Sequence, residues 1–162
     1  IMSLSVISFT ENGLALSGKV RETFTAEEVN LFTKCSFARE SAEAVYVEES
    51  TGQWAGKQME EGNALLFIGA CGIAVRAAAP WIKDKLHDSP VLVMDEMGHF
   101  VIPVLSGHMG GANELAERIS KVMGAVPVIT TATDLNRKFA VDLFAKRNHL
   151  AIADRELSLI HI

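Results

Sequence analysis

The stretch "VLVMDEMGHFVIPVLSGHMGGANELAERI", Val91 to Ile119, holds the pattern that decides the fold. Two apolar runs, 91–95 and 100–105, stand on either side of Asp95–Gly98, which has the composition of a tight turn. The two runs are therefore predicted to be antiparallel strands of a hairpin. A glycine-rich loop follows them, and then an amphipathic helix predicted over 112–123.

Outside the hairpin, apolar runs typical of buried strands alternate with helical patterns. Further strands are predicted at 4–10, 44–48, 64–70 and 126–130. Further helices are predicted at 12–22, 26–33, 52–60, 73–86 and 137–147, the fourth of them broken at Pro80. This alternation predicts the α/β class: a three-layer α/β/α domain with a mixed, mostly parallel sheet.

The composition limits the classes of function. The chain has 162 residues, of which 49% are hydrophobic, which is typical of a globular domain. Fifteen basic and 20 acidic residues give a net charge of −5, which argues against a nucleic-acid partner. No apolar run reaches the roughly 18 residues of a membrane span, so no membrane partner is expected. Two cysteines without CxxC spacing and no secretory n-region predict a cytoplasmic protein.

The first loop that can carry chemistry lies in "FIGACGIAVRA", 67–77. Gly69, Cys71 and Gly72 follow a buried strand and open a helix, so backbone N–H groups can approach an anion there. Arg76 can grip a carboxylate through two hydrogen bonds. The alternative is tight strand–helix packing with Arg76 on a solvated face. A thiolate role for Cys71 is also open, but a small buried residue is the favoured interpretation.

The second loop is the glycine-rich segment between the hairpin and the helix. Gly107, Gly110 and Gly111 indicate close backbone approach or positive φ angles. Either Gly111 or Asn113 can cap the helix.

His108 lies inside this loop, among residues expected to be exposed. A ligand-facing role is favoured over a structural one, because a structural histidine more often sits among apolar neighbours. His108 can act as a general acid or base near neutral pH. Ser106 and His108 are not evidence for a catalytic triad, because residues two apart in a loop rarely align as nucleophile and base.

Two further loops are polar. Thr131, Thr133 and Asp134 can bind polar substrate groups, or they can cap the following helix. In "DEMGHF", 95–100, two carboxylates and one histidine match no standard metal spacing, so a polar hairpin turn is the favoured interpretation.

The direction of the strands decides whether these loops meet. Ligands in open α/β sheets bind beyond the carboxyl ends of parallel strands. If strands 64–70, 100–105 and 126–130 are parallel, loops 69–72, 106–113 and 131–134 share one pocket. If 91–95 is parallel to 64–70, the hairpin reverses 100–105, and the loops divide between two edges.

Three segments together resemble one known family. "FIGACGIAVRAAAPWIKDK", "VLVMDEMGHFVIPVLSGHMGGANELAERI" and "VPVITTATDLN" resemble the N-terminal half of cobalt-precorrin 5A hydrolase, also called cobalamin biosynthesis protein G. The resemblance is strong from Ala64 to Leu150, and the first third of the chain is compatible with it.

The resemblance implies an enzyme of the anaerobic route to vitamin B12. Such an enzyme opens the δ-lactone of cobalt-precorrin 5A and releases acetaldehyde, giving cobalt-precorrin 5B. The cobalt belongs to the substrate, so neither a cofactor nor a protein-bound metal is implied. For this chemistry the residues of the loops offer His108 as general acid or base, with Asp134 or Glu114 orienting it, and backbone N–H groups at 70–72 or 107–111 as an oxyanion hole. The candidate substrate-binding residues are Gly69, Cys71, Gly72, Arg76, Ser106, Gly107, Gly110, Gly111, Asn113, Thr131 and Thr133.

Family members continue beyond the length of this chain. We therefore expect an N-terminal α/β domain over 1–136, the start of a truncated middle segment over 137–156, and a tail at 157–162. The tail "LSLIHI" matches one reading frame of a sequencing adapter and is expected to be non-native. The expected partners are the substrate and the missing middle and C-terminal domains.

Two other functions remain open at this point. One is a non-catalytic tetrapyrrole-binding module whose chemistry lies in the missing part. The other, a generic nucleotide-binding domain, ranks last because the chain has no phosphate-binding motif.

Overall fold

The computed structural model describes residues 2–107 and 110–132 of the chain. The chain divides into two compact units, Ile1–Val128 and Ile129–Ile162, which are considered separately. The first unit ends eight residues before the boundary predicted at 136. All helices and strands named below belong to it, and the predicted helix at 137–147 lies outside the described residues.

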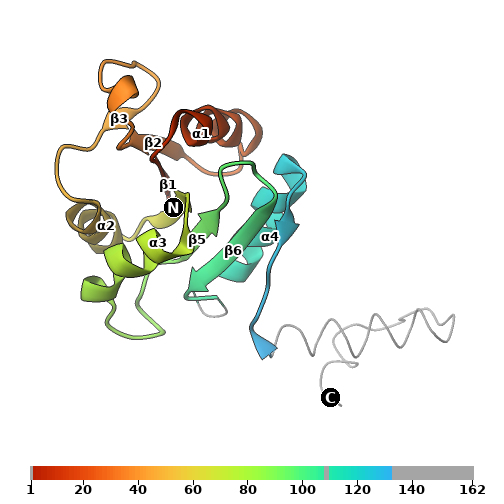
Figure 1. Cartoon of the computed structure of the whole chain (residues 1–162). Helices are drawn as coiled ribbons and strands as arrows, with labels where there is room; N and C mark the ends of the chain where they lie inside the picture. Colours follow the sequence, from red (N-terminus) through yellow and green to blue (C-terminus); the bar gives the residue numbers. More distant parts are fainter. Residues whose placement is uncertain (1, 108–109, 133–162) are drawn as a thin grey trace, which may run out of the picture. The chain divides into compact units, whose positions relative to one another are not determined.

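Strands and helices alternate along the first unit (Figure 1). The strands are β1 (Leu4–Ser8), β2 (Val29–Thr33), β3 (Val45–Tyr46), β4 (Ala64–Ile68), β5 (Val91–Met94), β6 (Phe100–Leu105) and β7 (Val126–Pro127). The α-helices are α1 (Glu11–Thr23), α2 (Thr51–Glu60), α3 (Cys71–Ala78) and α4 (Ala112–Met123), with short 3-10 helices η1 (Ser36–Ala38) and η2 (Ala79–Trp81).

The strands of the first unit form one sheet in the order β3-β2-β1-β4-β5-β6-β7. β1 to β5 are parallel to one another, whereas β6 is antiparallel to β5, and β7 is parallel to β6. The predicted mixed, mostly parallel sheet is confirmed. The two strands that run against the others both follow the hairpin.

Helices cover the two faces of the sheet. α2 and α3 contact each other on one face, where Trp54 and Ala74 pack with Phe67 and Val93 of the sheet. α1 and α4 contact each other on the opposite face. There a Cβ on Gly13 of α1 would lie 3.4 Å from the side chain of Ile68. The predicted three layers are therefore present.

One predicted helix is a strand. Residues 26–33 begin with Ala-Glu-Glu, a strong local helix signal, but β2 occupies Val29–Thr33. Its backbone pairs with β1 on one side and β3 on the other, and Leu31 and Thr33 are buried at alternate positions. Pairing with two neighbouring strands overrides the local propensity.

The ends of the helices follow their sequences. The Thr10 side chain accepts from the N–H of Gly13 at the start of α1, and Ser50 and Gln53 form a capping box at the start of α2. The predicted helix 73–86 is broken near Pro80, as expected, and ends as η2 at Trp81. In the described part of the chain, no helix is both long enough and apolar enough to cross a bilayer.

The hairpin turn is held by one carboxylate. Asp95 Oδ1 accepts from the backbone N–H groups of His99 (2.8 Å) and Phe100 (2.7 Å), and Oδ2 accepts from that of Met97 (3.2 Å). Gly98 has φ +72°, which an L side chain rarely adopts. The favoured interpretation of this segment as a polar hairpin turn is confirmed.

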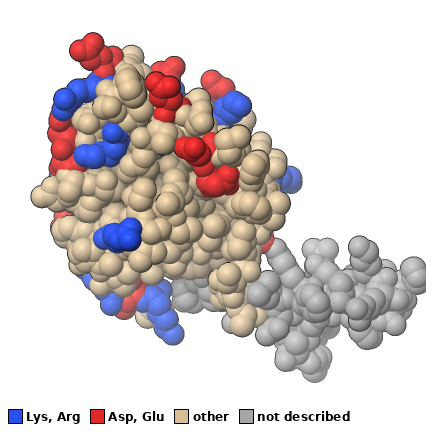
Figure 2. Space-filling view, in the orientation of Figure 1, with Lys and Arg blue, Asp and Glu red and all other residues tan. Residues whose placement is uncertain are grey.

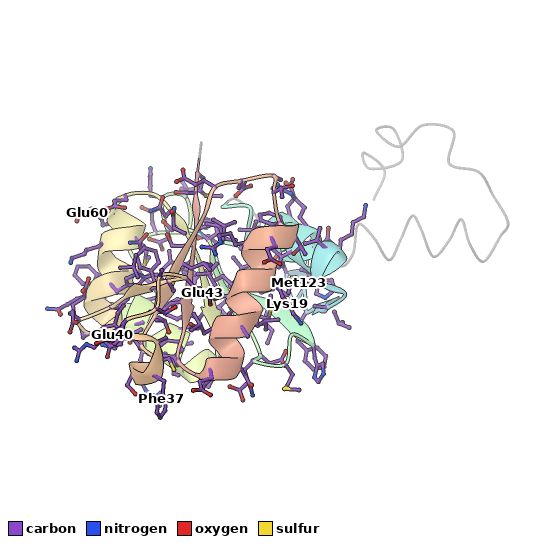
Figure 3. All side chains as sticks on the ribbon, turned by 90° about the horizontal axis from the view of Figure 1, so that it is seen from above. Lys19, Phe37, Glu40, Glu43, Glu60 and Met123 are labelled. Carbon is purple, nitrogen blue, oxygen red and sulfur yellow. The ribbon has the colours of Figure 1, made fainter. Side chains whose placement is uncertain are left out.

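The packing predicts different costs for the same substitution at two phenylalanines. Phe67 is fully buried, and its ring centroid lies 5.6 Å from that of Trp54, whereas Phe37 is 86% exposed and points away from the molecule (Figure 3). Phe67→Ala should lower the free energy of unfolding by about 3–5 kcal/mol, and Phe37→Ala by less than about 0.5 kcal/mol. Urea unfolding followed by far-UV circular dichroism measures both. Equal losses would contradict this assignment of the core.

Candidate functional site

Strand direction divides the predicted site between two edges of the sheet. We call the edge where β1, β2, β4 and β5 end the carboxyl edge, and the edge where they begin the amino edge. Because β6 is antiparallel to β5, it ends at the amino edge. At about 3.3 Å per residue, the five residues of β4 place the two edges roughly 16 Å apart. The alternative with divided loops is therefore the one observed.

The carboxyl edge holds the predicted residues around α3. Gly69 follows β4, and a Cβ there would lie 3.3 Å from the ring of Phe9. Cys71 is exposed at the start of α3, so the expectation that it is buried was wrong. Ala70 and Gly72 on either side of it are exposed as well. Arg76 folds back along α3, and its Nη1 donates to the carbonyl of Gly72 at 3.3 Å. The structure thus brings Gly69, Cys71, Gly72 and Arg76 to one edge.

The carboxyl edge also contains a cavity that the sequence did not reveal. This Phe9 pocket, of about 440 Å³, is lined by residues 9–12, 34–37 and Glu96. Thr10 Oγ1 donates to Glu96 Oε2 at 2.6 Å. The ammonium of Lys34 donates to the backbone carbonyls of Val47 (3.0 Å) and Glu49 (2.8 Å). The sequence feature that could have pointed to this pocket is the place of Phe9 and Thr10, which end the strand predicted at 4–10 just before the first predicted helix.

The amino edge holds the glycine-rich loop before α4. Ser106 has φ +59° and Gly111, the N-cap residue of α4, has φ +84°. The N–H of Ala112 donates to the carbonyl of Ser106 (3.1 Å), and that of Asn113 to the carbonyl of Gly107 (2.9 Å). These two N–H groups at the start of α4 therefore fix the backbone at the beginning of the loop.

The remaining residues of this loop are placed as follows. Gly110 lies so close to Ser106 that a Cβ would be 2.4 Å from the Ser106 Cβ. Asn113 is buried, and Glu114 is exposed on the first turn of α4. His108 lies outside the described residues.

The third predicted loop, 131–134, lies beyond the first unit. Thr131 belongs to the second unit, and Thr133 and Asp134 lie outside the described residues. Their predicted roles remain predictions.

A second cavity opens at the amino edge. This Trp81 pocket, of about 200 Å³, is lined by Gly56, Met59, Glu60, Trp81, Lys83 and residues 87–89. The Ser106 hydroxyl donates to the carbonyl of Asp88 at 2.8 Å, which joins the glycine-rich loop to the wall of the pocket. None of the residues lining the pocket was singled out from the sequence, because the pocket forms between segments far apart along the chain.

Charged side chains of both signs lie on the face shown in Figure 2. Acidic side chains lie mainly in its upper part, and Lys and Arg side chains lie at both its upper left and its lower left. Within the loop that follows η2, His87 Nδ1 lies 2.8 Å from Asp84 Oδ2. The hydrogen bond with His87 lowers the pKa of Asp84, and the N–H of Leu86 adds to this effect.

Comparison with known proteins gives the chain its family. Residues 53–134 match the family model described as cobalamin synthesis G N-terminal. The chain belongs to this family. The matched residues include all those that line the Trp81 pocket and the glycine-rich loop. Of the residues that line the Phe9 pocket, they include only Glu96.

Similar proteins carry related names. The chain is 52% identical over 92 residues to the cobalt-precorrin-5A hydrolase of Salmonella typhimurium, covering 57% of this chain and 26% of that protein. It is 35% identical over 144 residues to that of Priestia megaterium, covering 88% of this chain and 38% of that protein. The matched segments thus span about a quarter to two fifths of these relatives.

A solved structure shares the fold. It is titled as a putative cobalamin biosynthesis protein G homolog from Sulfolobus solfataricus, and it superposes with a TM-score of 0.58 at 22% identity. The superposition covers 83% of this chain and 39% of that one.

The tight approach at Gly110 predicts a loss of stability on substitution. Gly110→Ala should lower the free energy of unfolding by about 1–3 kcal/mol, because the new Cβ overlaps Ser106. Gly18→Ala is the control, because a Cβ at Gly18 in α1 meets nothing within 4 Å and should add up to about 1 kcal/mol. Urea unfolding tests both, and an unchanged midpoint for Gly110→Ala would contradict the described loop.

The Asp84–His87 contact predicts how the pKa of Asp84 responds to substitution. Removing the imidazole with His87→Ala should raise the pKa of Asp84 toward its ordinary value, whereas Lys85→Ala should leave it lowered. A depressed carboxyl pKa stabilises the fold above the unfolded pKa, and this contribution is lost as the pH falls through the folded pKa. Carbon-13 NMR of the carboxyl group measures the pKa directly. An Asp84 pKa unmoved by His87→Ala would refute the contact.

Proposed function

We propose that this chain forms the N-terminal part of a cobalt-precorrin-5A hydrolase. The observation that carries the proposal is the 35% identity over 88% of the chain to the Priestia megaterium protein of that name. The family match supports it, since it covers the glycine-rich loop and the surroundings of Trp81.

The reaction has clear chemical requirements. Water opens the δ-lactone of cobalt-precorrin 5A, and the methyl-bearing meso carbon leaves as acetaldehyde to give cobalt-precorrin 5B. The protein must activate the water, stabilise the oxyanion and supply a proton to the leaving oxygen. The cobalt enters with the substrate, so the chain need not hold a metal of its own.

We assign the chemistry to the amino edge. His108 stands in the chain between Ser106 and Gly110, whose backbones are fixed by close contact and by hydrogen bonding to α4. It is the candidate general acid and base. Glu114, exposed one turn into α4, and Asp134 are the candidates that orient it.

The direction of the strands separates the two predicted sets of oxyanion donors. The N–H groups at 70–72 lie at the carboxyl edge, because they follow β4. The candidate donors at the amino edge are the N–H groups of residues 107–111. Gly69, Cys71, Gly72 and Arg76 lie at the opposite edge, so any role they have is in binding a separate part of the substrate or of the longer protein.

A second function is favoured by the coverage of the relatives. The matched segments span no more than 38% of the two relatives compared here, so the remaining length can hold the chemistry. In that case this chain would be a non-catalytic tetrapyrrole-binding module. The rest of the longer polypeptide would then be its functional partner.

The experiment compares three proteins: this chain, the whole Priestia megaterium relative, and a chimera in which this chain replaces the matched segment of that relative. Acetaldehyde release from enzymatically prepared cobalt-precorrin 5A is measured without oxygen. Release by all three proteins supports catalysis by this part. Release by the relative and the chimera alone supports the binding-module function, and release by the relative alone contradicts both.

Within the chimera, His108→Gln should reduce acetaldehyde release at least about a hundredfold, because general acid–base catalysis contributes about 10²–10⁴-fold. His99→Gln is the matched control, since His99 lies in the exposed hairpin turn at the carboxyl edge. Near-normal release from His108→Gln would remove His108 from the mechanism.

A further inference from the structure

Trp81 lies flat on helix α2 in a fixed position. A Cβ on Gly56 would lie 2.3–2.7 Å from three atoms of the indole ring, so only glycine fits beneath it. The indole Nε1–H donates to the carbonyl of Gly52, one turn earlier, at 2.8 Å. Glycine within a helix weakens it, and Gly56 of this ten-residue helix admits the ring. The indole is therefore held by packing on one face and by its own polar group.

The same indole remains open to solvent. Trp81 is 42% exposed, and it forms one wall of the Trp81 pocket next to Met59. An indole whose N–H is already bound offers only flat apolar surface to a ligand. A flat apolar wall fits a flat conjugated ring.

A lysine and a histidine lie on the rim of this pocket. Lys83 and His87 both line it, and both are exposed. The backbone N–H of Lys83 donates to Asp88 Oδ1 at 2.8 Å, and His87 Nδ1 is held by Asp84. The loop that carries both residues is thus tied at two points. Such a rim suits a ring that carries carboxylate arms.

The Phe9 pocket suits such a ligand less well. Glu11 and Glu96 line it, and its one lysine, Lys34, already donates to two backbone carbonyls. A ligand carboxylate entering it would meet two negative charges. Glu60 and the buried Asp88 also line the Trp81 pocket. Asp88 Oδ1 accepts from the backbone N–H of Lys83, which leaves the ammonium of Lys83 outside this hydrogen bond.

We propose that the Trp81 pocket binds the edge of a flat macrocycle that carries carboxylates, with Trp81 against the ring and Lys83 against a carboxylate. This inference rests on the proposed function, and it assigns part of the substrate site to residues that the sequence did not reveal. The hydrogen bond from Ser106 to Asp88 places this pocket beside the glycine-rich loop.

The test is isothermal titration of the whole chain with cobyrinic acid, a cobalt corrin with free carboxylates. Trp81→Ala should weaken binding at least about fivefold, and Lys83→Gln about threefold or more. Phe37→Ala and Lys85→Gln are matched controls that remove an exposed aromatic ring at the opposite edge and a lysine outside the pocket. Thermal unfolding of each variant confirms that it folds.

A second ligand distinguishes the contact of Trp81 with the ring from the contact of Lys83 with a carboxylate. With dicyanocobinamide, a corrin whose peripheral carboxylates are amides, Lys83→Gln should change the Kd by less than about twofold, whereas Trp81→Ala should still weaken binding. This pattern supports the proposal.

Three results would overturn it: no binding to the wild-type chain at millimolar ligand, unchanged affinity of Trp81→Ala, or a loss confined to Phe37→Ala. Failure of the proposed function is seen separately, as absence of acetaldehyde release from the chimera. Binding by the Trp81 pocket can persist in that case.

Discussion

The reversal of the chain at Asp95–Gly98 is the constraint on which the rest of the site depends. One carboxylate accepts three backbone N–H groups, and Gly98 supplies the positive φ that closes the turn. A Cβ at Gly98 would lie 3.2 Å from Leu16, so the turn also packs closely on α1. Because the chain turns back here, β6 delivers the glycine-rich loop to the amino edge.

This reversal separates two loops that look alike in sequence. Both are small-residue segments between a strand and a helix, yet α3 begins at the carboxyl edge and α4 at the amino edge. Arg76 and the glycine-rich loop therefore lie at opposite edges of the sheet, next to different residues. At the amino edge, Ser106 reaches the carbonyl of Asp88, and a rigid indole stands nearby.

Much of the fold could be predicted from the sequence, because its signals are local. Hydrophobic periodicity, the hairpin turn and Pro80 each act over a few residues. Together they predicted the mixed sheet and most of the helices and strands. β2 was missed because its strand form depends on pairing with β1 and β3, whereas its first residues favour a helix. The three layers could be predicted from the alternation of strands and helices alone.

The candidate site was less predictable, for a related reason. The glycines at 107, 110 and 111 predict their loop from local sequence, and the structure shows close approach at Gly110 and a positive φ at Gly111. The Trp81 pocket left no such local mark. It needs Gly56 to lie beneath the ring of Trp81 and the carbonyl of Gly52 to accept from its indole N–H, which is a matter of tertiary packing. Cys71 was expected to be a small buried residue, but it is exposed at the first position of α3.

The two outer strands of the sheet have a consequence for how copies of this chain meet in solution. Within the described residues, β3 and β7 contain only two residues each, and Pro127 in β7 has no N–H to offer. A long unpaired strand edge is a template on which another chain can add a strand. Here each outer strand pairs with only two residues of its neighbour, so the outer strand itself offers another chain a ladder of two residues at most.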